Sequence, residues 1–154
     1  MNIKIRTPNS PLEWDNYYDL RYRVLRKPLN QPLGTEKNEG DASGIHFAFY
    51  ENKILKAIAR LDLQGNKIAQ VRFVAVESEQ QGSGFGKKIM LEIEDYCKEN
   101  DIQKIILHAR DYAVDFYLKL DYKLIEKSYK LFDVLQHFLM EKQLQNQLID
   151  SSAN

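Results

Sequence analysis

Residues 79–90 read EQQGSGFGKKIM and place three of the seven glycines of this 154-residue chain at alternate positions. They follow the apolar run VRFVAV, residues 71–76, and precede a segment with helical spacing. A strand, a glycine-rich turn and a helix start place unpaired backbone N–H groups at the positive end of a helix dipole. The stretch therefore predicts either a phosphate-binding loop or a tight strand-to-helix connection whose glycines only allow close packing.

Two familiar phosphate-binding motifs do not fit this spacing. The dinucleotide fingerprint requires a third glycine three residues after Gly84, where Lys87 stands. The nucleoside-triphosphate loop requires Gly-Lys followed by Ser or Thr, whereas here Gly86-Lys87 is followed by Lys88. A nucleotide-binding protein is therefore the least favoured interpretation of the glycine stretch.

Length and charge limit the organisation and the partners. With 154 residues, 44% of them hydrophobic, the chain is long enough for one core and too short for two ordinary domains. We expect one domain over residues 1–143 and a polar tail over residues 144–154. Lys+Arg and Asp+Glu both number 22, so no net positive field attracts a nucleic acid or an anionic membrane. Neither is an expected partner.

The compartment is also suggested by the sequence. The single cysteine, Cys97, cannot form an internal disulfide, and the first fourteen residues lack the apolar core of a signal peptide. No apolar run approaches the length of a transmembrane helix. These features predict a cytoplasmic protein.

Hydrophobic periodicity predicts the order of the elements. Strands are expected over residues 2–6, 45–51, 54–63, 68–76, 102–109, 122–130 and 134–140, the second to fourth forming an antiparallel meander. Helices are expected over residues 12–25, 84–100 and 111–120, with Ser10 capping the first, Pro11 opening it and Asp111 capping the last. Residues 26–44 are expected to be irregular, with one short helical turn.

Two motifs resemble those of a known family. Residues 81–86, QGSGFG, match the Gln/Arg-x-x-Gly-x-Gly/Ala motif of the GNAT superfamily of N-acetyltransferases. Residues 113–122, AVDFYLKLDY, resemble its second recurrent segment, Ala-x-x-Phe-Tyr-x-x-x-Gly-Phe/Tyr, with Asp121 where the family usually has glycine. The resemblance implies a mixed α/β fold in which helices flank a central, mostly antiparallel sheet of six to seven strands.

The resemblance also implies that acetyl-CoA is the cosubstrate. Loop amides would hold its pyrophosphate, and a strand would pair with its pantetheine arm. The binding residues implied are Val74, Ala75, Val76, Gln81, Gly82, Ser83, Gly84, Phe85, Gly86 and Lys87. No His, Cys, Asp or Glu group has metal-ligand spacing, so no metal is expected.

Acetyl transfer to an amine needs a base and an acid. The amine attacks only when neutral, although an alkyl ammonium has a pKa of about 10, and the departing thiolate then needs a proton. Tyr117 lies where GNAT enzymes commonly supply that proton, and a phenol stays protonated at neutral pH. The alternative role of Tyr117 is that of a core tyrosine.

The base is less clearly marked. His108 ends an apolar strand and could relay a proton, although histidines on such strands are more often hydrogen-bonded core residues. His46 and His137 are further candidates facing the acceptor. Arg72 and Phe73 occupy the region where some family members carry a glutamate base, so that role does not transfer. No serine or cysteine lies in a nucleophile motif, which favours direct transfer without a covalent enzyme intermediate.

The acceptor is expected to be a small-molecule amine or a peptide. Glu36, Glu39 and Asp41 in the irregular segment would attract a cationic amine, or would simply keep that segment soluble. An acyl-CoA-binding sensor or interaction module with the same fold is the alternative to an enzyme, and a homodimer is a possible assembly. Substitution of Tyr117 distinguishes the enzyme from the sensor.

Overall fold

The computed structural model describes residues 2–144. These residues form two compact units, one of residues 2–62 and 71–93 and the other of residues 63–70 and 94–144. Most of the expected polar tail, residues 145–154, lies outside the described residues. Leu144, its first residue, is buried and donates its N–H to the Gln103 carbonyl at 2.8 Å, so the packed region extends one residue beyond the expected boundary.

Four strands form the sheet of the first unit. They are β1 (Ile3–Arg6), β2 (Ile45–Glu51), β3 (Ile54–Gly65) and β4 (Ile68–Val76), adjacent in that order, with the tips of β3 and β4 in the second unit. β1 pairs with β2, and β2 with β3, in antiparallel register. The predicted bounds of β2 and β4 are confirmed, because short turns with strong sequence signals separate these strands.

The two hairpin turns follow from local chemistry. Asn52 and Lys53 have φ of 52° and 70°, and Asn66 and Lys67 have 54° and 63°. Two consecutive residues with positive φ match the right-handed twist of the flanking strands, and asparagine tolerates this conformation better than most side chains.

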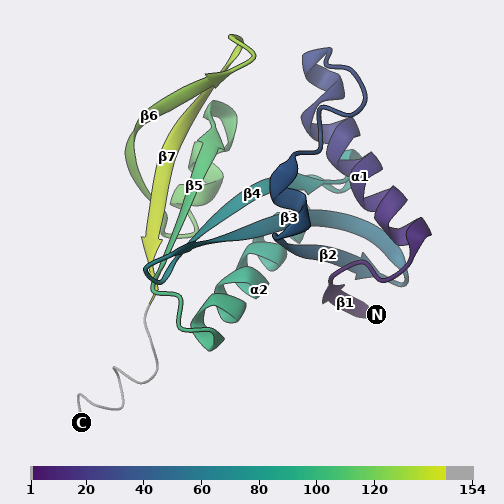
Figure 1. The fold of residues 1–154 in the computed structure, drawn as a ribbon, viewed down its shortest axis with the longest axis horizontal. Coiled ribbons are helices and arrows are strands. Elements are labelled where there is room, and N and C mark those ends of the chain that lie inside the picture. Colours follow the sequence, from purple (N-terminus) through teal and green to yellow (C-terminus); the bar gives the residue numbers. More distant parts are fainter. Residues whose placement is uncertain (1, 145–154) are drawn as a thin grey trace. The chain divides into compact units, whose positions relative to one another are not determined.

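Helix α1 (Pro11–Leu25) packs on one face of this sheet (Figure 1). The predicted N-cap is confirmed, because the Ser10 side chain accepts a hydrogen bond from the Glu13 N–H at 3.2 Å. The cluster that joins helix and sheet contains Tyr17, Leu20, Leu25, Ala48, Tyr50, Ile58 and Ala75. Burial of these side chains fixes the helix against β2, β3 and β4.

Helix α2 (Phe85–Glu99) packs with its first half on the opposite face of the sheet. Phe85 meets Phe49 of β2 with ring centroids 5.0 Å apart, and Phe49 alternates with Ala48 and Tyr50, which face α1. The 3₁₀ turn η3 (Ser78–Gln80) and the glycine stretch connect β4 to this helix.

The second unit contains β5 (Lys104–Arg110), β7 (Leu135–Gln143) and β6 (Lys123–Leu131), adjacent in that order and antiparallel. Helix α3 (Val114–Leu118) lies between β5 and β6 in the sequence. The end of α2 is tied to this unit, since Glu94 accepts hydrogen bonds from the Tyr122 hydroxyl at 3.0 Å and the Lys142 ammonium at 2.9 Å. Seven strands with flanking helices confirm the predicted fold class.

Three local expectations need correction or completion. Asp111 does not cap an α-helix: it begins the 3₁₀ turn η4 (Asp111–Ala113), and no side chain caps α3. The irregular segment contains two 3₁₀ turns, η1 (Lys27–Leu29) and η2 (Glu39–Ala42), and not one. Asp121 adopts φ of 69°, so it takes the left-handed conformation for which the family usually uses glycine. The turn before β6 is therefore retained.

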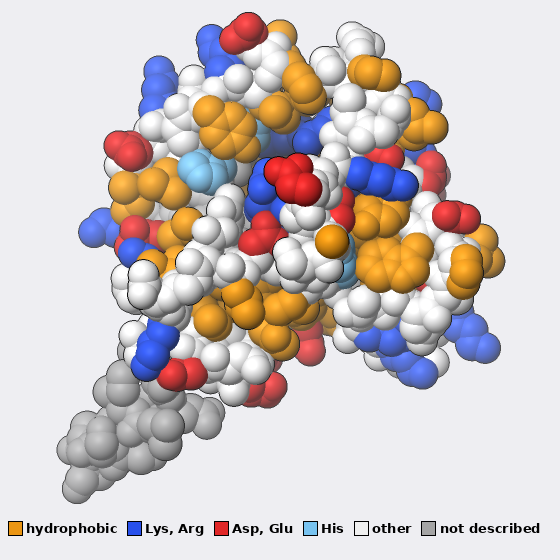
Figure 2. All heavy atoms as spheres, viewed as in Figure 1, with side chains coloured by type: hydrophobic (Ala, Val, Ile, Leu, Met, Phe, Trp, Pro, Cys, Tyr) orange, Lys and Arg blue, Asp and Glu red, His pale blue; other side chains and the backbone are white. Residues whose placement is uncertain are grey.

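Charged side chains of both signs are interspersed on the face drawn in Figure 2, consistent with 22 cationic and 22 anionic residues. Over residues 2–144, no helix is both long enough and apolar enough to cross a membrane.

Candidate active site

The glycine stretch adopts backbone conformations that explain its composition. Gly82 and Gly84 have φ of 88° and 86°, a region that other residues enter at a cost. A Cβ atom added at either position would meet no heavy atom of residues 2–144 within 4 Å. Packing within the protein therefore does not require these glycines. The requirement is backbone conformation, and the space beside the loop is open to a ligand.

The loop ends where α2 begins. The helical bond from the Lys88 N–H to the Gly84 carbonyl measures 3.0 Å, so the amides of Phe85, Gly86 and Lys87 form the first turn. Amides in a first turn have no acceptor within their own helix and carry the positive end of its dipole. Gln81 fastens the loop to β4 by donating its side-chain amide to the Val76 carbonyl at 3.3 Å. A pantetheine arm paired with Val76 would share or displace this bond.

Replacing Gly84 with alanine is expected to weaken acetyl-CoA binding by about tenfold or more, or ~1.4 kcal/mol, measured by titration calorimetry. The backbone conformation alone costs about 1–2 kcal/mol of folding stability when a side chain is added. Gly65→Ala is a matched control, because Gly65, the last residue of β3, has φ of 83° and equally open surroundings. Gly65→Ala should lose similar stability and keep its affinity, and an equal loss of affinity in both variants would remove the loop from the binding site.

Tyr117 has a largely buried ring, and its hydroxyl is the group expected to donate a proton. It is 7% exposed, and its ring packs edge-on against Phe116 and Tyr122 at centroid distances of 4.9 and 5.7 Å. No hydrogen bond to its hydroxyl is found within residues 2–144, and its oxygen is not among the fully buried polar atoms that lack a partner. Burial raises the pKa of Tyr117, with Tyr112 adding to the shift and Arg110 opposing it. Its proton is therefore retained at neutral pH.

His108 lies on β5 in a group of aromatic and polar side chains from β6 and β7. Its Nδ1 is 2.9 Å from the Ser128 hydroxyl, and its ring is 5.3 Å from that of Tyr129. Tyr129 in turn stacks on His137 at 4.5 Å. His137 is 4% exposed, and its Nδ1–H donates to the Leu135 carbonyl at 3.1 Å. His137 therefore has a packing role, whereas His108 is half-buried beside a hydroxyl.

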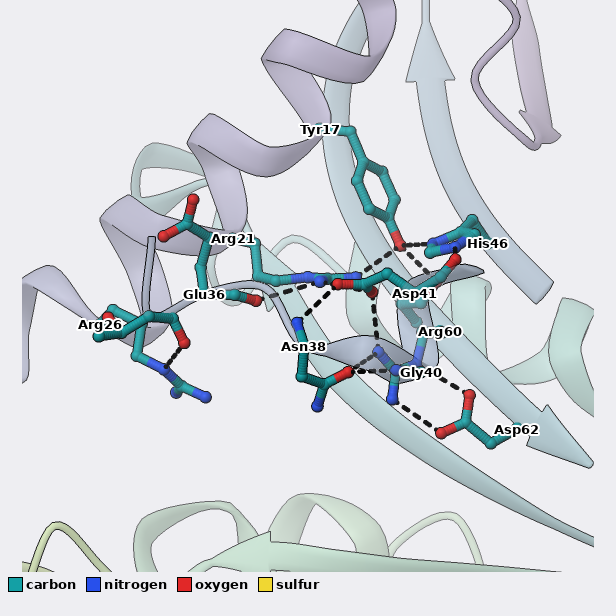
Figure 3. Close-up of polar contacts among 12 residues, drawn as sticks. Tyr17, Arg21, Arg26, Glu36, Asn38, Gly40, Asp41, His46, Arg60 and Asp62 are labelled. Carbon is teal, nitrogen blue, oxygen red and sulfur yellow. Dashed lines mark hydrogen bonds and ion pairs between the residues drawn. The ribbon is translucent and has the colours of Figure 1, made fainter. Parts of the chain in front are cut away.

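A buried ionic network fastens the irregular segment to α1 and β3 (Figure 3). One Asp41 carboxylate oxygen accepts hydrogen bonds from Arg21 of α1 and Arg60 of β3, both at 2.8 Å. Both arginine side chains are fully buried, and Arg60 also forms a two-bond pair with Asp62 at 2.8 Å. Asp41 is therefore occupied by two internal cations.

The same network holds His46. The Tyr17 hydroxyl lies 2.7 Å from Nδ1 of His46, and the Asp41 carbonyl lies 2.9 Å from Nε2. A carbonyl only accepts, so Nε2 carries the proton and Nδ1 accepts from Tyr17. Burial lowers the pKa of His46, which the Asp41 carbonyl opposes and Arg21 reinforces. At 5% exposure, with both ring nitrogens bound inside the protein, this histidine serves the network.

The acidic residues of the segment do not form a common site for a cationic amine. Glu36 is 4% exposed and accepts a hydrogen bond from the Gly34 N–H at 2.7 Å. Asp41 is paired as described, and Glu39 is exposed. The expectation that all three attract the acceptor is therefore wrong for two of them.

Two glycines make room for Arg60. A Cβ on Gly40 would lie 2.6 Å from Arg60 Nη2, and one on Gly44 would lie 2.6 Å from Arg60 Cδ. The sequence shows glycines at both positions, but their partner is at least sixteen residues away in the chain. Sequence reasoning missed the network for this reason.

The predicted site residues fall into two groups. The residues implied for acetyl-CoA, from Val74 to Val76 and from Gln81 to Lys87, lie on one continuous segment of the first unit, whereas Tyr117 and His108 lie in the second. Over residues 2–144, no group of three or more His, Cys, Asp or Glu side chains could hold a metal ion.

Comparison with known proteins identifies the family. The protein-family model described as an acetyltransferase (GNAT) domain matches residues 24–144 of this chain. A Bacillus subtilis (strain 168) protein that carries the provisional name of an acetyltransferase is 28% identical over 146 residues, covering 93% of this chain and 97% of that protein.

Solved structures share the fold. One from Lactobacillus plantarum, provisionally named an N-acetyltransferase, has a TM-score of 0.82 and 21% identity, covering 93% of this chain and 99% of that one. An aminoglycoside 6'-N-acetyltransferase solved with coenzyme A has a TM-score of 0.76 and 16% identity, covering 93% of this chain and 97% of that one.

Proposed function

Because the chain belongs to the GNAT acetyltransferase family, we propose that it transfers the acetyl group of acetyl-CoA directly to a primary amine of a small molecule or peptide. Acetyl transfer with acetyl-CoA as cosubstrate follows from the family. The glycine loop supports placing the acetyl-CoA site on particular residues of this chain, because Gly82 and Gly84 have positive φ and open space beside them just ahead of α2. Residues 81–87 would bind the pyrophosphate, and residues 74–76 the pantetheine arm.

The reaction forms a C–N bond and breaks the C–S bond of the thioester. The amine loses a proton to a base or to water, and His108 is the candidate base. The sulfur receives a proton from Tyr117, whose hydroxyl has no hydrogen-bond partner among the described residues. A backbone N–H of residues 74–76 would stabilise the oxyanion that develops on the carbonyl.

Direct transfer is supported by the state of Cys97, which is fully buried and free. Burial raises the pKa of its thiol to about 12, with the Glu94 carboxylate adding to the shift. A thiol that stays protonated and out of reach is a poor nucleophile, so an acetylated cysteine intermediate is disfavoured.

The test measures release of the free CoA thiol from acetyl-CoA, with and without a panel of primary amines, alongside mass analysis of the amines and of the intact protein. Thiol release that depends on an amine, with acetyl found on that amine and none on the protein, is the expected result. Acetyl-CoA binding without amine-dependent release would favour the sensor. Stable acetylation of the protein before amine is added would contradict direct transfer.

A further inference from the structure

Four guanidinium groups surround the ring of Phe73 on β4. The distances from their carbons to the ring centroid are 4.2 Å for Arg21, 4.9 Å for Arg60, 5.2 Å for Arg72 and 5.6 Å for Arg26. All five residues belong to the first unit. Cations are attracted to the face of an aromatic ring, but they repel one another at this spacing. The cluster therefore needs anions.

Phe73 itself has an unusual backbone. Its φ is 57°, although it lies within a strand and carries a bulky side chain. Such conformations cost of order 1–3 kcal/mol and gather at functional sites. In this conformation the half-buried ring of Phe73 lies among the arginines. Phe73 directly precedes Val74 in the sequence, where the proposed pantetheine-binding stretch begins.

The carboxylates bound to these arginines do not account for all of them. Asp41 and Asp62 are bound by Arg21 and Arg60. Arg72 is half-buried, and within residues 2–144 its guanidinium has neither a hydrogen bond nor an ion pair, only its contact with Phe73. The cluster therefore carries positive charge that remains available at Arg72, which ligand molecules can approach from solvent.

We propose that Arg72 binds a carboxylate of the acceptor, so that the acceptor is an amine that also carries a carboxylate group. This inference rests on the proposed function, which places the acetyl group at residues 74–76, next to Arg72 on the same strand. A planar guanidinium matches a carboxylate with two parallel hydrogen bonds. Arg72 also repels a polycationic amine, and the acidic residues Glu36 and Asp41 are already bound within the protein.

The test compares matched pairs of acceptors. Each common α-amino acid is offered beside its own primary amide, which has the same amine and no carboxylate, with spermidine and kanamycin as polycationic amines. Rates of CoA thiol release give kcat/KM for each compound. The acids are expected to exceed their amides by about tenfold or more, because hydrogen bonds between charged groups are among the strongest in proteins.

Variants connect that preference to Arg72. Arg72→Gln should raise KM for the acids by about tenfold or more and leave the amides nearly unchanged, and Arg72→Lys should restore part of the preference. Lys4→Gln, which removes an exposed cation from β1 of the same unit, is the control and should keep the preference intact. Thermal unfolding with acetyl-CoA should be the same for all three variants and the wild type.

The outcomes separate this inference from the proposed function. Equal turnover of acids and amides, preference for the polycations, or a preference that survives Arg72→Gln would overturn the carboxylate site and leave the acetyltransferase intact. Absence of turnover with every amine would count against the proposed function. In that case, calorimetric titration of the CoA-saturated protein with each amino acid and its amide decides whether Arg72 binds carboxylates. Equal affinity for acid and amide would exclude a carboxylate site at Arg72.

Discussion

Replacing Tyr117 with phenylalanine is expected to lower kcat for acetyl transfer by about 10²- to 10⁴-fold, the range typical of a lost general acid. The variant removes one oxygen from a ring that packs against Phe116 and Tyr122, so the core remains filled. The affinity for acetyl-CoA should stay within about twofold, since the role assigned to this hydroxyl arises only as the thiolate departs. Steady-state rates and calorimetric titration measure the two quantities.

Tyr112→Phe is the matched control for this substitution. Tyr112 lies five residues earlier, is 71% exposed, and its hydroxyl accepts a hydrogen bond from Arg110 at 3.0 Å. Loss of the Tyr112 hydroxyl should leave kcat nearly unchanged. Burial raises the pKa of Tyr117, so its protonated form persists to higher pH than that of a free phenol, and the rate should show no loss through Tyr117 between pH 7 and 9. A Tyr117→Phe enzyme with normal kcat would exclude Tyr117 as the proton donor.

Replacing Asp41 with alanine is expected to cost about 3–5 kcal/mol of unfolding free energy, because it leaves two fully buried guanidinium groups without their shared carboxylate. For a chain of this length, that loss lowers Tm by about 6–20 °C. The same substitution releases η2, since the Asp41 carboxylate also accepts the Asn38 N–H at 3.0 Å. Denaturant unfolding and calorimetry give the two values.

Glu39→Gln tests whether the effect is specific, because Glu39 is exposed in the same 3₁₀ turn and should change stability by less than about 0.5 kcal/mol. Burial alone would raise the pKa of Asp41, but the Asn38 N–H and the guanidiniums of Arg60 and Arg21 outweigh it, so the pKa lies below its usual value. The stabilisation by ionised Asp41 is therefore complete above the unfolded pKa and is lost as pH falls through the folded one. A loss below about 1 kcal/mol in Asp41→Ala would show that the network stabilises little.

Local signals explain why much of the fold could be predicted. Ser10-Pro11 fixes the start of α1, asparagines fix both hairpin turns, and those turns mark where β2 ends and β4 begins. The positive φ of Gly82 and Gly84 likewise agrees with the spacing that marked the loop. These features depend on neighbouring residues, so a single sequence contains them.

Features that depend on distant residues could not be predicted. Asp41 meets Arg21 and Arg60 across twenty and nineteen positions, and no local pattern marks either pair. The left-handed conformation of Phe73 has no sequence signal, because a bulky residue in an apolar strand predicts regular β structure. Interpreting Asp41 as a residue that attracts a cationic amine failed because its arginine partners are distant in sequence, whereas Glu36 is buried and bound by the nearby Gly34 N–H.

Thermal unfolding in the presence of excess acetyl-CoA, beside ATP and NAD at the same concentration, tests most directly whether this chain uses its glycine loop for acetyl-CoA. At about 100 times the Kd, a ligand that binds only the folded state adds about 2.7 kcal/mol. For 154 residues, that gain raises Tm by about 5–11 °C. We expect this rise with acetyl-CoA and no comparable rise with ATP or NAD. An unchanged Tm with acetyl-CoA, or a rise with ATP or NAD alone, would contradict this expectation.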